Sequence, residues 1–164
     1  MTVSVAPQRS VGRARSDPEP ATVFIASAAL SVVAGGLVAA VTGPFEWAQG
    51  SWLAAYLVLV CGVGGFGIGT MQRRAAAGLS PVWARTQLGG WVGGNAAVIV
   101  GSLSGLPLGV DVGVVLLEGA LVIALIRSPG IAEIGHLRSW VYRALLLVLI
   151  LSAPIGSVLS HLRH

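Results

Sequence analysis

Glu118 is the residue of this sequence whose position could support chemistry inside a membrane. It lies in an uninterrupted apolar run, residues 112–117 and 119–126. A carboxylate at the middle of a bilayer costs about 2.5–3.5 kcal/mol on insertion scales, so Glu118 should face other helices. It could bind a proton or a cation, or it could be a neutral acid hydrogen-bonded to a neighbouring helix. The expected partners are Asn95 first, because an amide both donates and accepts, and then Ser102 and Ser104.

The other polar pairs indicate no catalytic or metal centre. Glu133 and His136 have the E-x-x-H spacing that puts two ligands on one helix face, as in di-iron sites. Such a site needs a second pair and further carboxylates, and the chain has six acidic residues in all. A buried bis-His haem needs histidines inside membrane spans, whereas His136, His161 and His164 lie at or beyond the expected span ends. We therefore expect no metal and no cofactor.

Motifs of known enzyme classes are also missing from the sequence. There is no P-loop, no G-x-S-x-G and no H-E-x-x-H. No serine has an internal base nearby that could activate it as a nucleophile. The sequence therefore predicts a protein that is not an enzyme.

The composition predicts an integral membrane protein. Of 164 residues, 55% are hydrophobic and 10% are charged, against about 25% charged in a soluble domain. This excludes a soluble enzyme and a nucleic-acid-binding domain, and the single cysteine, Cys61, excludes an intrachain disulfide scaffold. All ten basic residues are arginines and 23 residues are glycines, which suggests a GC-rich bacterial genome. We expect a multi-pass protein of the bacterial plasma (inner) membrane.

Apolar runs and their interruptions predict an all-α polytopic membrane helix bundle with five transmembrane helices. Residues 1–20 should be a disordered cytoplasmic tail, and residues 21–164 a single transmembrane domain. The spans are expected at about 21–43, 52–70, 87–104, 110–126 and 143–161. The first apolar run could alternatively be a signal peptide, but it is longer than the hydrophobic region of a signal peptide. Residues 87–126 could alternatively form a re-entrant hairpin, which would leave polar backbone groups unpaired in lipid.

The arginines predict the orientation of the chain. They gather in the tail, in the connection after the second span and in the connection after the fourth, and the other two connections have none. Since arginine is retained on the cytoplasmic side, the amino terminus should be cytoplasmic and the carboxyl terminus outside. Those expected to fix the topology and contact lipid headgroups are Arg73, Arg74, Arg85, Arg127, Arg138 and Arg143. Residues 128–142 could form a surface helix with Trp140 and Tyr142 at the interface.

Small residues recur at every fourth position of the third expected span and predict close helix packing. This stripe consists of Gly89, Gly93, Ala97, Gly101 and Gly105, with Gly90 and Gly94 forming a second register beside it. Small residues let helices approach closely in a membrane, where hydrophobicity cannot drive association. Glycines also lower helix propensity, so residues 62–69 should be irregular.

Abundant packing surface and little chemistry favour a non-catalytic role. We expect an accessory or interaction subunit of a membrane complex, whose partners are membrane lipid and another membrane protein or a second copy of the chain. Nucleic acid is not an expected partner. The alternative is a small oligomeric transporter or channel in which Glu118, together with Asn95 and Ser102, forms the intramembrane polar site.

Overall fold

A computed structural model describes residues 19–74, 80–126 and 140–152, which form helices and include no strand. The all-α class predicted from the sequence is therefore confirmed for this part of the chain. The helices are α1 (Pro20–Thr42), α2 (Gly50–Tyr56), the π-helical stretch η1 (Leu57–Gly64), α3 (Gly65–Arg74), α4 (Pro81–Leu103), α5 (Pro107–Ile126) and a C-terminal helix, Trp140–Ser152. The segments α2, η1 and α3 follow each other without a break and act as one long helix.

Proline and glycine set the helix ends. Pro20, Pro81 and Pro107 each begin a helix, at the position where the missing N–H of proline does no harm. The chain leaves α4 through Gly105, whose φ of 64° is readily adopted by glycine. The N–H of Leu106 donates to the carbonyl of Gly101 at 2.8 Å, as in a Schellman motif. A turn of three residues thus joins α4 to α5.

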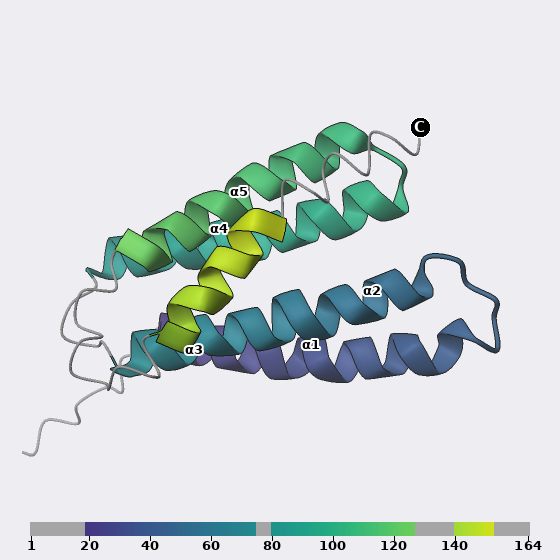
Figure 1. Ribbon diagram of the computed structural model, residues 1–164, viewed down its shortest axis with the longest axis horizontal. Coiled ribbons are helices and arrows are strands. Elements are labelled where there is room, and N and C mark those ends of the chain that lie inside the picture. Colours follow the sequence, from purple (N-terminus) through teal and green to yellow (C-terminus); the bar gives the residue numbers. More distant parts are fainter. Residues whose placement is uncertain (1–18, 75–79, 127–139, 153–164) are drawn as a thin grey trace, which may run out of the picture.

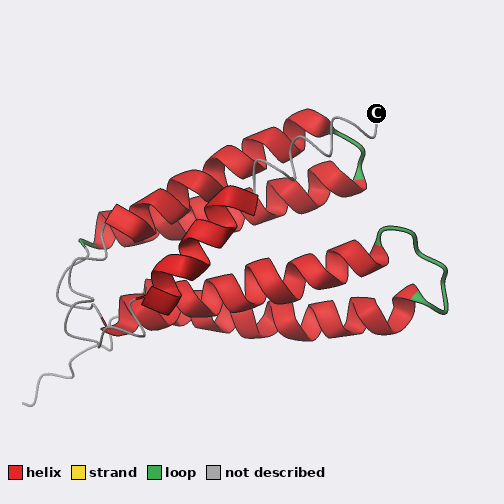
Figure 2. Ribbon diagram, viewed as in Figure 1, coloured by secondary structure: helices red, strands yellow, loops and turns green. Residues whose placement is uncertain are grey.

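The long helices form two antiparallel hairpins that lie side by side (Figure 1). The first hairpin is α1 with α2–η1–α3, and the second hairpin is α4 with α5. Both turns lie at the same end of the molecule, drawn in green in Figure 2. The C-terminal helix, yellow in Figure 1, starts near the opposite end and lies across both hairpins.

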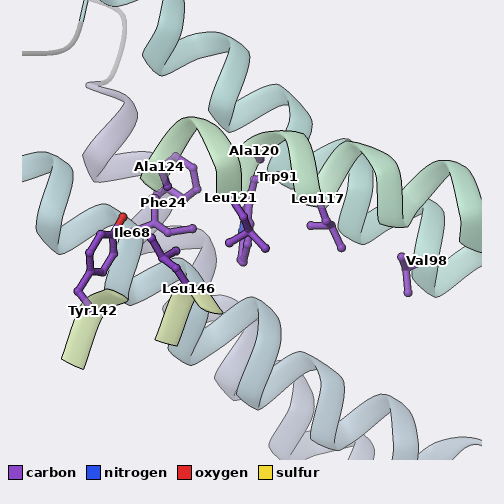
Figure 3. Close-up of a cluster of buried hydrophobic side chains, with 10 residues drawn as sticks. All are labelled: Phe24, Ile68, Trp91, Val98, Leu117, Ala120, Leu121, Ala124, Tyr142 and Leu146. Carbon is purple, nitrogen blue, oxygen red and sulfur yellow. The ribbon is translucent and has the colours of Figure 1, made fainter. Parts of the chain in front are cut away.

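The buried core lies where the two hairpins and the C-terminal helix meet (Figure 3). Every one of these elements contributes to it. Its members are Phe24, Ile68, Trp91, Val98, Leu117, Ala120, Leu121, Ala124, Tyr142 and Leu146. The rings of Phe24 and Trp91 lie 6.2 Å apart and connect the hairpins through an aromatic contact.

Within the described residues, three helices are long and apolar enough to cross a membrane: Pro20–Thr42, Gly50–Arg74 and Pro107–Ile126. They correspond to the first, second and fourth expected spans. The third expected span is found as α4, which begins at Pro81 rather than near residue 87. This longer helix includes Arg85 and Gln87, which lower its apolar character below that of α5.

The C-terminal helix begins at Trp140, before the expected start of the fifth span at residue 143. Trp140 is exposed, whereas Tyr142 is buried in the core. The reason is that the helix packs its Tyr142 and Leu146 face onto the two hairpins. The tail 1–18, the proposed surface helix up to residue 139 and the end of the fifth span after residue 152 lie outside the described residues.

Candidate functional site: the seam between the hairpins

The second hairpin is closed by direct contact between the backbones of its helices. A β-carbon built on Gly101 would lie 2.7 Å from the backbone nitrogen of Val110, and one on Gly113 would lie 2.6 Å from that of Val98. A β-carbon built on Gly94 would lie 2.9 Å from the carbonyl oxygen of Gly113, which is a similarly close approach. These glycines allow α4 and α5 to touch as small-residue helices do in membranes.

The residues of the stripe expected on α4 lie in different surroundings. Gly101 packs against α5, the carbonyl of Ala97 lies near Gly109, and Gly105 forms the turn. Gly89 faces open space, and Gly93 has Leu116 at 3.9 Å as the nearest atom to an added β-carbon. The inner face of α4 instead uses Gly90 and Gly94, which belong to the second register.

The first hairpin places glycine mainly against side chains. A β-carbon on Gly35 would lie 2.7 Å from Val58 Cγ2, and one on Gly69 would lie 2.8 Å from Phe24 Cβ. The C-terminal helix packs against Gly64 and Gly67. A β-carbon on Gly64 would lie 3.2 Å from Leu149 Cδ1, and one on Gly67 would lie 2.8 Å from Leu145 Cδ2.

Asn95 is the centre of a buried polar cluster between the hairpins. Its Oδ1 accepts a hydrogen bond from the hydroxyl of Tyr56 at 3.0 Å and another from the thiol of Cys61 at 3.1 Å. Its Nδ2 donates to the carbonyl of Trp91 at 2.7 Å. Three of the four hydrogen bonds that an asparagine side chain can make are therefore used inside the bundle. The ring of Tyr56 also stacks on Trp52, with centroids 5.3 Å apart.

The π-helical stretch η1 brings Tyr56 and Cys61 to the same acceptor. Residues five apart on an α-helix point about 140° away from each other. A π-turn closes with an i→i+5 hydrogen bond, so residues five apart lie nearly one above the other. The expected irregular segment at residues 62–69 is found mostly upstream, at Leu57–Gly64, and α3 is regular from Gly65.

A second polar contact joins the hairpins one helix turn beyond Trp91. The Nε2 of Gln72 in α3 donates to the Oε1 of Gln87 in α4 at 2.7 Å. The remaining amide atoms, Gln72 Oε1 and Gln87 Nε2, are buried without a hydrogen-bond partner in the described part of the chain. Gln87 is only 1% exposed. The surface on which Tyr56, Cys61, Gln72, Gln87, Trp91 and Asn95 meet is called the seam below.

Glu118 and Ser102 lie apart from the Asn95 cluster. Glu118 is half-buried on the face of α5 that carries Val114, Leu121 and Leu125, which pack against the core. The hydrogen bonds of Asn95 go to Tyr56, Cys61 and Trp91, and Glu118 has none with the described residues. Ser102 is half-buried in the last turn of α4, and Ser104 is exposed in the turn.

The described arginines gather at one end of the molecule. Arg73 and Arg74 form the end of α3, Arg85 lies in the first turns of α4, and Arg143 lies near the start of the C-terminal helix (Figure 1). Arg73 Nη2 lies 3.4 Å from the hydroxyl of Thr22, which connects α3 to α1 at this end. Arg127 and Arg138 lie outside the described residues.

The chemistry that the side chains of the seam offer is hydrogen bonding between uncharged groups. Among the described residues, no three His, Cys, Asp or Glu side chains come together to hold a metal ion. Cys61 is buried beside an amide and a phenol and has no neighbouring base to activate its thiol. Glu133, His136, His161 and His164 fall outside the described residues.

The sequence analysis predicts Asn95 as a polar site residue, but it does not identify four other members of the seam, Tyr56, Gln72, Gln87 and Trp91. A signal was present, because Ala84, Gln87, Trp91, Asn95 and Val98 recur at spacings of three and four and define one face of α4.

Comparison with models of known protein families, with curated proteins and with solved structures finds no match to this chain.

Proposed function

We propose that this chain is a non-catalytic, multi-pass subunit that associates with another membrane protein through the outer face of α4. The observation that carries the proposal is a difference between the two helices of one hairpin. The outward residues of α5 are bulky and apolar, as suits contact with lipid: Leu108, Val112, Val115, Val122 and Ile126. The middle of the outward face of α4 is small and partly polar, at Thr86, Gly89, Gly93 and Ala96, and the exposed Val82 and Val100 lie at its two ends.

Small outward residues favour a helix rather than lipid as the neighbour of α4. An added β-carbon on Gly89 would meet no atom of the described residues within 4 Å, so the described helices do not fill this surface. A helix that rests on glycine and alanine gains close van der Waals contact, which is the main source of helix association in membranes. The partner is therefore a transmembrane helix of a second protein.

The proposed topology has both hairpins crossing the membrane. At 1.5 Å per residue, the 23 residues of α4 and the 20 residues of α5 are about 34 and 30 Å long. Either length matches the ~30 Å hydrocarbon core, which favours two full crossings over a re-entrant hairpin. The arginine end would face the cytoplasm, and the turn with Glu46 and the start of α5 with Asp111 would face outside. A bacterial plasma membrane is the proposed location.

The test is purification from native membranes in mild detergent, with mass spectrometry of the proteins that accompany the chain. We expect a stoichiometric larger membrane protein with the wild type and its loss from Gly89→Leu/Gly93→Leu. The matched control is Gly119→Leu, which also fills open space but on the bulky face of α5. Equal recovery of the partner by both variants, or a wild-type chain without any partner, would overturn the proposal. A homo-oligomer lost in the first variant alone would identify the partner as a second copy.

A transporter or channel is the second candidate, and one observation favours it. Glu118 is half-buried in the middle of α5 without a hydrogen bond to the described residues. An intramembrane acid in this state is available to bind a proton or a cation. If the chain is a transporter or channel, Glu118→Gln should abolish the flux of protons or cations into proteoliposomes. If it is a subunit, Glu118→Gln should leave its association with the partner intact. Flux retained in Glu118→Gln would eliminate the second candidate.

A further inference from the structure

The contacts across the seam differ in kind from the contacts within each hairpin. Inside the hairpins, glycine meets backbone or aliphatic side chains. Across the seam, uncharged polar side chains hydrogen-bond to each other, at Asn95 and at the Gln72–Gln87 pair, and Gly64 and Gly65 lie against the ring of Trp91. The helices approach each other closely along the whole of each hairpin, but only locally between the hairpins. The seam is therefore the interface at which the molecule can open with the smallest loss of favourable contact.

The Gln72–Gln87 pair specifically opposes closure of the seam. Two facing amides can exchange two hydrogen bonds, but this pair makes one. Gln72 Oε1 and Gln87 Nε2 are buried and have no hydrogen-bond partner among the described residues. An unpaired polar atom in a closed apolar site carries its full desolvation cost, and in an open site it binds water instead.

We propose that the two hairpins part along the seam as rigid units, and that the half-bonded Gln72–Gln87 pair keeps the closed and open arrangements close in free energy. Apolar contact around Trp91, which is 3% exposed and lies against Phe24, holds the seam closed. Opening hydrates the amides of Gln72, Gln87 and Asn95 together with the thiol of Cys61.

Cys61 is a reporter of this opening that the chain already contains. It is the only cysteine of the sequence, it lies in the seam, and it is 8% exposed in the closed arrangement. Maleimides react with the thiolate, which forms only when water reaches the sulfur. The rate at which N-ethylmaleimide labels Cys61 in native membranes therefore follows the population of the open seam. We expect slow but complete labelling of the wild type, and immediate labelling after solubilisation in SDS.

Two leucine variants test the role of the glutamine pair by the sign of their effects. Gln72→Leu/Gln87→Leu removes both unpaired atoms, so labelling should slow by about tenfold, which corresponds to about 1.4 kcal/mol in favour of the closed seam. Gln72→Leu alone removes the single hydrogen bond and leaves the whole amide of Gln87 unpaired, so labelling should accelerate. The matched control is Gln49→Leu, an exposed position in the first turn, which should leave the rate unchanged.

A second reporter distinguishes opening of the seam from general unfolding. Ala120 lies between α4 and α5, 3.5 Å from the β-carbon that would be added to Gly90. A cysteine introduced as Ala120→Cys in a Cys61→Ala chain should stay unlabelled over the time in which Cys61 reacts completely. Equal labelling at the two positions would overturn the rigid-unit proposal.

Two further results would overturn the proposal. One is a wild-type Cys61 that does not react in membranes at all. The other is a change in the same direction for the single and the double leucine variants. If the double variant does not accumulate in membranes, the test rests on Gln72→Leu alone. Labelling of Cys61 in Gln72→Leu that is no faster than in the wild type would contradict the role of the pair.

Discussion

The second hairpin meets backbone against backbone, whereas the first hairpin mostly meets glycine against side chain. An added β-carbon on Gly113 would approach the backbone of α4 at 2.6 Å, but one on Gly35 would first meet the side chain of Val58 at 2.7 Å. A side chain can rotate away, and a helix backbone cannot move without separating the helices. The first hairpin therefore has room for local irregularity, and it is the one that contains the π-helical stretch η1. The second is regular throughout α4 and α5.

The largest expected effect comes from filling the backbone contact of the second hairpin. Gly113→Ala should destabilise the protein by about 2 kcal/mol, because overpacking of this kind costs about 1–3 kcal/mol. Gly119→Ala on the same helix meets no atom within 4 Å and should stabilise by about 0.5–1 kcal/mol through helix propensity alone. The measurement is unfolding in mixed micelles with increasing SDS, followed by circular dichroism. Equal stabilities of the two variants would contradict the backbone contact.

A smaller effect is expected at the corresponding site of the first hairpin. Gly35→Ala displaces Val58 and brings the new β-carbon 3.0 Å from the carbonyl oxygen of Ala54, but it also gains helix propensity, so its net cost should be about 1 kcal/mol. The neighbouring Gly36 faces open space, and Gly36→Ala should stabilise by about 0.5–1 kcal/mol. In the same SDS titration, a gap between these two variants as large as that between Gly113→Ala and Gly119→Ala would remove the distinction between the hairpins.

The smallest expected effect concerns the contact between the hairpins. Tyr56→Phe removes one of the two hydrogen bonds to Asn95 Oδ1 and leaves the bond from Cys61. Since side-chain hydrogen bonds between membrane helices average about 0.6 kcal/mol, the free energy of unfolding should fall by about that amount. Tyr142→Phe is the control, because the Tyr142 hydroxyl makes no hydrogen bond with the described residues and its ring packs in the core. A larger loss for Tyr142→Phe would show that the Asn95 cluster contributes no net stability.

The sequence predicted the helical elements because their signals are local. Charge-free runs identified α1, the long helix from Gly50 to Arg74, and α5. The glycine and proline of residues 105–109 located the break between α4 and α5, which occurs at residues 104–106. Five membrane spans and the orientation of the chain stay predictions.

The partners within the seam could not be predicted, because they depend on how helices far apart in sequence face each other. Gly89 with Gly93 and Gly90 with Gly94 have the same spacing, and periodicity alone cannot decide which pair faces α5. The sequence analysis pairs Asn95 with Glu118 because an amide can both donate and accept a hydrogen bond, which says nothing of the face of α4 on which Asn95 lies. Rules based on 3.6 residues per turn also place Tyr56 and Cys61 on different faces, and the π-helical stretch brings them together.

The short turn between α4 and α5 has a consequence for the biosynthesis of the protein. In the second hairpin, α4 emerges from the ribosome before α5. It carries Arg85, Gln87 and Asn95 and partitions into lipid less readily than α5. Three residues later the chain begins α5, whose backbone lies directly against α4. The polar helix can thus enter the bilayer together with the apolar one, as a preformed pair. Lengthening this connection with a flexible insert should leave α4 outside the membrane in a fraction of newly made chains, and glycosylation acceptor sites placed in the turn would count that fraction.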